Sequence, residues 1–421
     1  MTPGVGRGAP AAPRRYAEPV LHITGSWQRA ARGAGLLSPD GSLAPTIFAE
    51  ITAAAVRHGA VNLGQGFPDE DGPIEILDAA TRAIRDGVNQ YPPGRGASVL
   101  LEAIADHQHR FYGIDLDPTR EILVTAGATE ALTATLLALL DGPEDEVVVF
   151  EPYYDSYAAA VALAGARLVP VPLRWPALEP DLDDLRAAVG DRTRIILVND
   201  PHNPTGTVFS REVREEIVRL AHRHDALIVT DEVYEHLVVE GTHVPLATLP
   251  VAAGRTLSIS SGGKTFRTTG WKIGWVSGPA ELVDAVLAVK QYLTYVNGAP
   301  FQPAIAVGLG LPDTYFEDLA ATQRERRDLL GEGLAAAGFE VSVPAGSYFT
   351  VADAAPMLRP GEDAADFCRT LPERIGVAAI PLTAFVSEAH RAEFATLVRF
   401  AACKRTEVIA EAARRLAASA R

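Results

Sequence analysis

The sequence contains little of what marks a secreted, a membrane or a nucleic-acid-binding protein. Only two of its 421 residues are cysteines, Cys368 and Cys403, which are too few for a disulfide framework and suit a reducing cytoplasm. No apolar run approaches the length of a membrane span. The 38 basic residues are outnumbered by 53 acidic ones, and the net charge of −15 argues against a basic, nucleic-acid-binding face. The composition therefore predicts a soluble, cytoplasmic protein with neither a membrane nor a nucleic-acid partner.

The first 43 residues differ in composition from the rest. They are rich in Gly, Pro, Ala and Arg, with five arginines against two acids, and they lack the apolar core of a secretory signal. We expect a poorly ordered extension, although a start codon assigned too early would give the same sequence. Predicted order begins with a helix whose apolar residues share one face: Ile47, Phe48, Ile51 and Ala55.

From residue 120 onward, strands alternate with helices. Short, continuous apolar runs occupy residues 121–125, 146–150, 194–198 and 226–230. Such runs are expected where both faces of a sheet are covered, so the pattern predicts an α/β fold with a mostly parallel sheet. A chain of this length with 48% hydrophobic residues can bury a large core, and we expect two subdomains or more.

Small, polar or aromatic residues that could bind a ligand follow each of these strands. A small-residue segment from Ala126 to Thr129 follows the first, Tyr154 the second, Asn203 the third and Asp231 the fourth. In open α/β sheets, ligands bind at the carboxyl ends of the strands. The sequence therefore predicts a ligand site at this edge of the sheet.

One further strand, predicted at 256–260, leads to a lysine. The chain continues as Ser261-Gly262-Gly263, where two glycines predict a tight turn, and Lys264 follows directly. A lysine amine is nucleophilic only when it is neutral, and desolvation or a nearby cation can lower its pKa enough for Schiff-base chemistry. A lone loop lysine is ordinarily a surface residue, so the surrounding pattern has to decide between the two interpretations.

That pattern, Ser-x-Gly-Lys-Thr-Phe-x-x-Thr-Gly-Trp-Lys-x-Gly-Trp over residues 261–275, resembles the pyridoxal-phosphate lysine segment of class I/II aminotransferases. It is most similar to the branch with kynurenine and glutamine transaminases and actinobacterial succinyldiaminopimelate aminotransferases. The resemblance implies PLP fold type I, with Lys264 as the catalytic, cofactor-bearing lysine. It also implies a large cofactor-binding domain at 76–300 and a small α+β domain formed by 44–75 with 301–421.

A phosphate site is expected where a helix begins, because free N–H groups there bind anions. Its predicted members are Gly127, Ala128, Thr129, Ser261, Lys272 and, lent across a homodimer interface as the resemblance implies, Tyr91. Taken singly, most of these residues have an ordinary explanation, such as a plain helix start. Many relatives carry arginine at the position of Lys272, and the lysine matches the kynurenine/glutamine branch.

The remaining predicted residues would surround the cofactor ring and the amino acid. Asp231 would keep the ring nitrogen protonated, and Tyr234 and Asn203 would hydrogen-bond its phenolic oxygen, while Tyr154 would stack on the ring. The predicted substrate-binding residues are Gly66, Asn203 and Arg399, the last because a guanidinium pairs with a carboxylate in two parallel hydrogen bonds. No metal site is predicted.

The resemblance implies an aminotransferase that moves an amino group from an L-amino acid to a 2-oxoacid, with 2-oxoglutarate expected as acceptor. N-succinyl-diaminopimelate and kynurenine- or glutamine-type amino acids are the expected donors. Arg95 is the sequence-based candidate for binding a distal carboxylate of the donor. Two alternatives remain: β-elimination from cysteine conjugates at the same site, and a regulator that binds the cofactor without turnover. The short, Gly/Pro-rich amino-terminal segment disfavours the regulator, which would carry a DNA-binding winged helix there.

Overall fold

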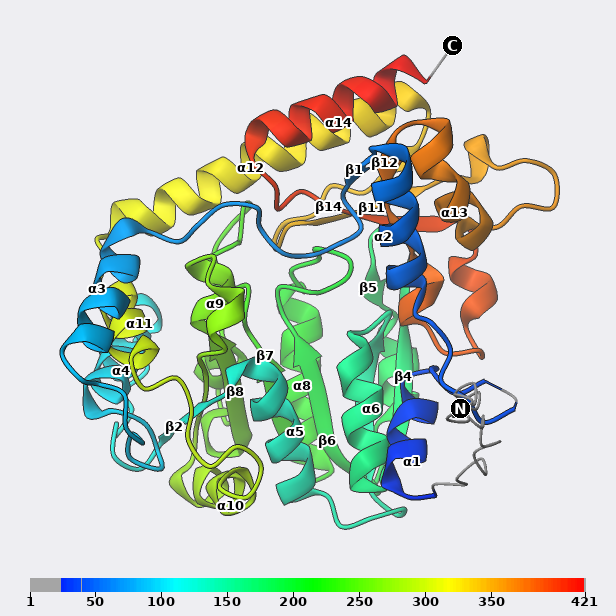
Figure 1. Ribbon diagram of the computed structural model, residues 1–421. Helices are drawn as coiled ribbons and strands as arrows, with labels where there is room; N and C mark the ends of the chain where they lie inside the picture. Colours follow the sequence, from blue (N-terminus) through cyan, green and yellow to red (C-terminus); the bar gives the residue numbers. More distant parts are fainter. Residues whose placement is uncertain (1–23, 39, 420–421) are drawn as a thin grey trace, which may run out of the picture.

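The computed structural model describes residues 24–38 and 40–419 of the chain, which are drawn in colour in Figure 1. Residues 1–23 of the predicted extension lie outside the described residues. The expectation of poor order was wrong for the part that follows, because helix α1 (Ser26–Gly33) packs against α6 (Asp155–Ala164). A Cβ atom at Gly33 would lie 2.6 Å from the carbonyl oxygen of Ala158, so the small residues that suggested disorder serve close helix packing.

An eight-stranded sheet forms the centre of the molecule. Its order is β2-β9-β8-β7-β6-β3-β4-β5, with β9 and β5 antiparallel to their neighbours and the other strands parallel. The strands are β2 (Ile122–Thr125), β3 (Glu146–Glu151), β4 (Arg167–Arg174), β5 (Glu179–Pro180), β6 (Thr193–Asn199), β7 (Leu227–Asp231), β8 (Thr256–Ser261) and β9 (Gly274–Ser277). The predicted α/β fold with a mostly parallel sheet is confirmed.

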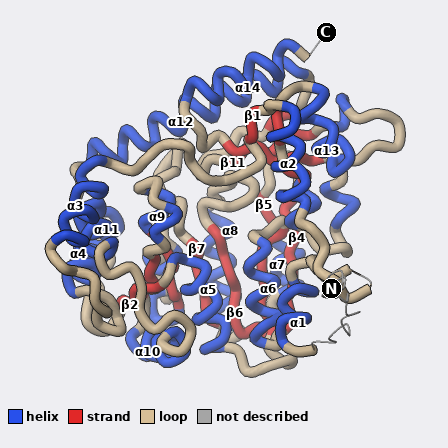
Figure 2. Tube along the Cα trace, viewed as in Figure 1, coloured by secondary structure: helices blue, strands red, loops and turns tan. Residues whose placement is uncertain are grey.

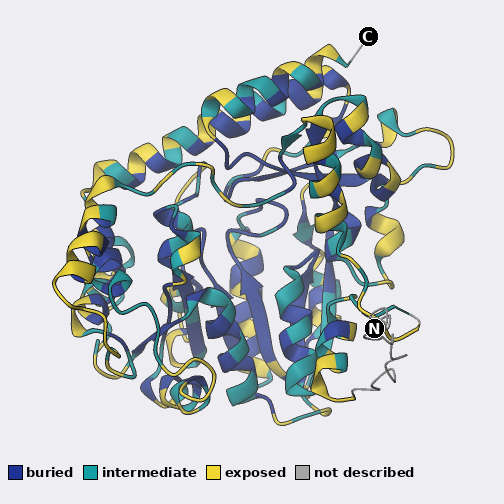
Figure 3. Cartoon of the chain, in the orientation of Figure 1, coloured by how far each residue is buried: buried dark blue, intermediate teal, exposed yellow. Residues whose placement is uncertain are grey.

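Helices cover both faces of this sheet, which explains why its strands are apolar throughout. Val147 and Val149 of β3 pack with α5, α6 and α10, whereas Val148 and Phe150 point to the opposite face and pack with α7 and α8. The central strands are buried, α7, α8 and α10 carry exposed residues, and α5 and α6 have only buried and partly buried residues (Figure 3). The covering helices are α5 (Gly127–Leu139), α7 (Leu182–Ala188), α8 (Arg211–Arg223) and α10 (Ala280–Lys290).

Three further helices pack against the β2–β9 end of the sheet. They are α3 (Ile74–Arg85), α4 (Ser98–Tyr112) and α11 (Phe301–Leu309). Their apolar residues share one buried cluster with Ile122, Val124 and Trp275. The domain boundaries predicted from the sequence stay a prediction.

A second, four-stranded antiparallel sheet has the order β10-β11-β14-β13. Its strands are β10 (Glu340–Val341), β11 (Phe349–Asp353), β13 (Ile380–Pro381) and β14 (Leu397–Ala401), and a short parallel pair joins β1 (Val61–Asn62) to β12 (Val377–Ala378). The neighbouring helices are α2 (Ile47–His58), α12 (Asp313–Ala337), α13 (Ala364–Arg374) and α14 (Thr406–Ala418). The long α12 and α14 lie side by side (Figures 1 and 2).

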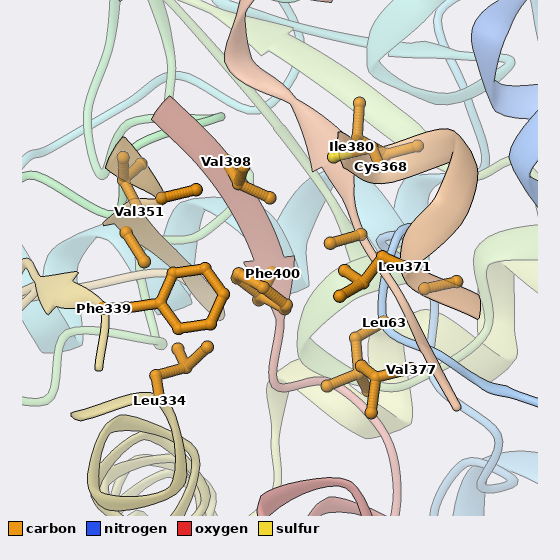
Figure 4. Packing of buried hydrophobic residues seen from close by; sticks show 14 of the residues in the cluster. Leu63, Leu334, Phe339, Val351, Cys368, Leu371, Val377, Ile380, Val398 and Phe400 are labelled. Carbon is orange, nitrogen blue, oxygen red and sulfur yellow. The ribbon is translucent and has the colours of Figure 1, made fainter. Parts of the chain in front are cut away.

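The core of this second part lies against one face of β14. Val398 and Phe400 belong to an apolar cluster with Phe339, Leu371 and residues of β12 (Figure 4). Because side chains alternate along a strand, Arg399 between them points to the opposite face. Among the described residues, no helix is both long enough and apolar enough to cross a membrane.

Candidate active site

A cavity of about 420 Å³ lies between the carboxyl edge of the large sheet and the four-stranded sheet. β2 runs in the same direction as β8, because both pair antiparallel with β9, so the ends of β2, β3, β6, β7 and β8 meet at this edge. All the predicted site residues but one line the cavity: Gly66, Gly127, Ala128, Thr129, Tyr154, Asn203, Asp231, Tyr234, Ser261, Lys264, Lys272 and Arg399.

At one corner of the cavity, the start of α5 faces a lysine. Gly127 has a φ of +74°, a backbone conformation that favours glycine, and a Cβ atom there would crowd Nζ of Lys272 at 3.1 Å. Lys272 itself has left-handed backbone angles, φ 55° and ψ 49°, just before β9. Unpaired N–H groups at a helix start and an ammonium group together form a cradle for an anion such as a phosphate.

Asp231, the last residue of β7, is buried at the floor of the cavity. Its Oδ2 accepts a 2.6 Å hydrogen bond from the hydroxyl of Tyr157, and its Oδ1 is buried with no hydrogen-bond partner among the described residues. Burial raises the pKa of Asp231 to about 6, although the hydrogen bond from Tyr157 and the nearby Lys264 act in the opposite direction. An unpaired, buried carboxylate oxygen that borders a cavity suits a cationic N–H donor.

Asn203 and Tyr234 come from the segments that follow β6 and β7. Asn199 fixes this region, because its Nδ2 donates to the carbonyl of Asp231 at 2.7 Å and its Oδ1 accepts from the backbone N–H of Asn203 at 2.6 Å. The ring of Tyr234 packs edge-on against that of Tyr348, with centroids 5.3 Å apart. Tyr154, at the start of α6, packs in the same manner against Tyr157.

Lys264 lies in α9 (Gly262–Thr265), a single helical turn where the sequence predicts a tight turn. The two glycines are needed for close packing, since a Cβ atom at Gly262 would lie 2.7 Å from Cδ1 of Ile305. Nζ of Lys264 donates to the carbonyl of Gly66 at 3.3 Å, and the hydroxyl of Tyr348 donates to the same carbonyl at 2.6 Å. Burial lowers the pKa of Lys264, which increases the neutral fraction of its amine.

Arg399 extends from β14 into the cavity among aromatic rings. Its guanidinium carbon lies 4.4 Å from the ring centre of Phe349 and 4.6 Å from that of Phe385. Nη2 donates to the carbonyl of Gly64 at 2.6 Å and Nη1 to Oδ1 of Asn203 at 3.3 Å, whereas Nε is buried without a hydrogen-bond partner among the described residues. Burial lowers its pKa to about 10, so it stays cationic at neutral pH and can bind a carboxylate.

Tyr91 is the predicted site residue that does not line the cavity. Its side chain is 80% exposed, and its ring packs edge-on against Tyr295 at 5.5 Å. Arg95 lies away from the cavity as well, with Nη2 paired to Asp284 and Nη1 donating to the carbonyl of Arg120. Within a single chain, the position of Arg95 therefore gives no support to the hypothesis that it binds a distal carboxylate.

Several cavity residues were missed by sequence reasoning. Phe48 from α2 and Phe385 from the segment after β13 line the cavity beside Arg399, and both look like ordinary core residues in the sequence. Tyr157, which does not line the cavity but donates to Asp231, was missed too, although it follows Tyr154 by three residues. Asp155, next to Tyr154, also lines the cavity.

Comparison with known proteins shows which family has a sequence and a fold like those of this chain. The family model described as aminotransferase class I and II matches residues 58–416. A Mycobacterium tuberculosis protein named "Probable N-succinyldiaminopimelate aminotransferase DapC" is 51% identical over 384 residues, spanning 89% of this chain and 96% of that protein. The solved structure of the M. tuberculosis N-succinyldiaminopimelate aminotransferase covers 89% of this chain and 97% of its own, with a TM-score of 0.85 and 50% identity.

The names of more distant relatives contain other amino acids. A mouse protein named kynurenine–oxoglutarate transaminase 3 is 35% identical over 392 residues, spanning 86% of this chain and 85% of that protein. The structure of an Escherichia coli methionine aminotransferase has a TM-score of 0.86 at 36% identity, covering 90% of this chain and 98% of its own.

Proposed function

The chain belongs to the class I and II aminotransferase family, and from this membership we propose the donor, the acceptor and the residue roles of its reaction. The protein is a pyridoxal-phosphate-dependent aminotransferase of PLP fold type I. We propose N-succinyl-diaminopimelate or a kynurenine- or glutamine-type amino acid as donor and 2-oxoglutarate as acceptor. The meeting of Asp231, Lys264 and Arg399 in one cavity supports the transamination chemistry, and the names of the relatives support the choice of donor and acceptor.

The residues of the cavity fit the cofactor. The unpartnered Oδ1 of Asp231 suits a protonated ring nitrogen, and the cradle formed by the start of α5, Ser261 and Lys272 suits a phosphate. Tyr234 and Asn203 would hydrogen-bond the phenolic oxygen, and Tyr154 would stack on the ring. The bound cofactor supplies an electron sink that acidifies the Cα–H bond of the amino acid.

Lys264 would bear the cofactor and move the proton at Cα. Its amine lies in the cavity, held by the carbonyl of Gly66, and its lowered pKa favours the neutral form that a general base requires. Because the amine is buried, bulk water cannot readily exchange the proton it holds. In the second half of the reaction, with the 2-oxoacid bound, the same amine would deliver a proton to Cα of the new amino acid.

Arg399 would bind the α-carboxylate of donor and acceptor. Its unpartnered Nε provides donor capacity, and the aromatic rings around it exclude water and strengthen the charge–charge attraction. Gly66 and Asn203 lie beside it and would orient the same carboxylate. Fixing the carboxylate places the Cα–H bond toward Lys264.

We also propose a homodimer with shared sites. An exposed aromatic surface, formed by Tyr91, Tyr292, Leu293 and Tyr295, is the observation that supports it. In such a dimer Tyr91 would contribute its hydroxyl to the phosphate site of the partner. A cytoplasmic location is proposed as well, on the acidic composition and the two unpaired cysteines.

A panel of amino acids offered with 2-oxoglutarate tests the reaction. Glutamate formation from N-succinyl-diaminopimelate, kynurenine or glutamine identifies the donor. Release of pyruvate and ammonia from a cysteine conjugate, without glutamate, would instead favour the β-elimination alternative. The relatives are named aminotransferases or transaminases, so amino-group transfer is the main proposed activity and β-elimination the alternative.

A further inference from the structure

Two histidines and a glutamate that take no part in the reaction described above meet between α4 and the segment that follows β7. Nε2 of His107 lies 2.6 Å from Nε2 of His236. One nitrogen or carboxylate oxygen from each of His107, Glu235 and His236 lies within 4.8 Å of the other two. Local sequence does not reveal this group, because the two histidines are 129 positions apart and belong to no metal-binding motif.

Glu235 is a buried carboxylate whose hydrogen bonds come from hydroxyl groups. Its side chain is in a residue only 5% exposed, and it accepts from Tyr112 at 2.8 Å and from Ser260 at 2.5 Å. Within the part of the chain that the structure describes, no salt bridge joins Glu235 to a cationic side chain. His243, which packs against the ring of Tyr112, is paired with Glu232 instead. Buried carboxylates are ordinarily paired or bound to a metal ion, so Glu235 lacks its usual partner.

The surroundings of the two imidazoles are those of a shielded metal site. The ring centre of His236 lies 4.3 Å from that of Phe316, and both histidine rings lie 4.8 Å from that of Phe111. His107 is only 2% exposed, and the side-chain amide of Gln108 lies 3.5 Å from its Nδ1. Metal-bound imidazoles ordinarily have a hydrogen-bonding partner at this second nitrogen, inside a hydrophobic shell.

Hydrogen bonding alone is the ordinary explanation for the group. A proton between the two Nε2 atoms would account for their short separation, but it leaves Glu235 without a cation. A tetrahedral ion with bonds of about 2.0 Å needs its ligand atoms about 3.3 Å apart. The separations found here, from 2.6 Å to at most 4.8 Å, bracket that value. Side-chain rotations would therefore allow an ion to contact both nitrogens and the carboxylate at once.

We propose that His107, Glu235 and His236 bind a divalent transition-metal ion such as Zn²⁺. Two imidazoles and one carboxylate are a ligand set that zinc uses in proteins. Glu235 and His236 directly follow Tyr234, so the ion would join the segment that leaves β7 to α4. None of the three ligands lines the cavity that holds Lys264, so the site does not depend on the proposed function.

The test measures the metal content of the untagged, full-length holoenzyme. The protein is treated with a chelator, incubated with excess ZnCl₂ and desalted. The wild type should retain about one zinc ion per chain, and zinc should raise its Tm by on the order of 3 °C. Glu235→Gln, which keeps the size of the side chain, should retain less than about a tenth as much. The matched control is His109→Asn, which removes an exposed histidine from the same helix as His107 and should bind zinc as the wild type does.

A spectroscopic measurement keeps the test decisive if Glu235→Gln does not fold. X-ray absorption of the zinc-loaded wild type should show nitrogen and oxygen neighbours only, with the scattering pattern of imidazole. Sulfur neighbours at about 2.3 Å would place the ion at Cys368 or Cys403 and overturn the inference. Absence of retained zinc in the wild type, or full retention by a folded Glu235→Gln variant, would overturn it too. None of these results bears on whether the holoenzyme transfers amino groups.

Discussion

The hydroxyl of Tyr157 donates a 2.6 Å hydrogen bond to Oδ2 of Asp231, and this bond holds a buried carboxylate whose other oxygen has no partner among the described residues. The pKa of Asp231 is raised from 3.8 to about 6 by burial, so the folded chain binds its proton more tightly than the unfolded chain does. The carboxylate is therefore a cost to the cofactor-free fold that becomes useful when a cation binds beside it.

Asp231→Asn should stabilise the cofactor-free protein at high pH and impair the enzyme. Because the pKa of Asp231 is raised in the folded chain, its ionisation lowers the free energy of unfolding. This loss is absent below pH 3.8, grows as the pH rises toward 6 and is complete above pH 6. A shift of this size corresponds to about 3 kcal/mol. Chemical unfolding at pH 8 and pH 5 should show a larger gain in unfolding free energy at pH 8, while kcat/KM falls roughly 10- to 100-fold. A variant less stable than wild type at pH 8 contradicts the argument.

Tyr157→Phe should act in the opposite direction on stability. Its hydrogen bond favours the ionised form of Asp231, so its loss raises the pKa further and lowers the unfolding free energy at pH 8 by about 1 kcal/mol. The loss should shrink at pH 5, where Asp231 in the folded chain is largely protonated. A loss of equal size at both pH values would show that Tyr157 contributes through packing alone.

The central sheet could be predicted from the sequence because its strands are buried on both faces. Residues 146–150 form a continuous apolar run for this reason, and β3 covers residues 146–151. The cavity residues at the strand ends follow from the same pattern, since strand direction fixes which ends meet. Much of the candidate site was therefore predictable once the strands were placed.

Other features depend on packing between distant segments, which local sequence does not reveal. Phe48 and Phe385 are 337 positions apart and border the cavity only because α2 and the segment after β13 meet there. Gly262 and Gly263 suggested a turn, but they serve close contacts with Ile305 and Thr269. Composition likewise suggested disorder for α1, whose small residues pack on α6.

Borohydride reduction of the holoenzyme should fix the cofactor to Lys264. The sequence has only four lysines, at positions 264, 272, 290 and 404, so the modified peptide can be assigned without ambiguity. Lys264→Ala should take up no reducible label and lose activity on the order of 10²- to 10⁴-fold. Lys404→Met, which removes a neighbouring amine bound to the carbonyl of Phe67, is the control and should still be labelled at Lys264. Label at any other lysine contradicts the assignment.

Arg95→Ala should leave substrate preference unchanged. Its guanidinium is engaged by Asp284 and the carbonyl of Arg120 outside the cavity, so its loss removes a half-exposed ion pair worth about 1 kcal/mol or less. The kcat/KM values for glutamate and methionine should fall together or not at all. Asp284→Asn, which removes the other partner of the ion pair, should have the same effect on both values. A selective loss for glutamate would restore Arg95 as a determinant of acidic substrates.

The shared-site dimer can be tested by mixing two inactive variants. Tyr91 is 80% exposed and lies outside the cavity of its own chain, so a role at the phosphate site requires a partner. Lys264→Ala and Tyr91→Ala chains are expressed separately, unfolded, mixed in equal amounts and refolded. If each site takes Lys264 from one chain and Tyr91 from the other, half of the dimers are mixed. Each mixed dimer then holds one intact site, so about a quarter of wild-type activity returns.

Light scattering provides the independent check, since the mass should be that of two chains at micromolar concentration. Tyr292→Arg places a charge on the exposed aromatic surface, where Tyr292 is 84% exposed, and should yield monomers with low activity. No recovery of activity in the mixture, together with dimers by light scattering, would mean that each chain completes its own site. A fully active wild-type monomer would rule out the shared arrangement altogether, because Tyr91 could not then reach a phosphate bound at the start of α5 in another chain.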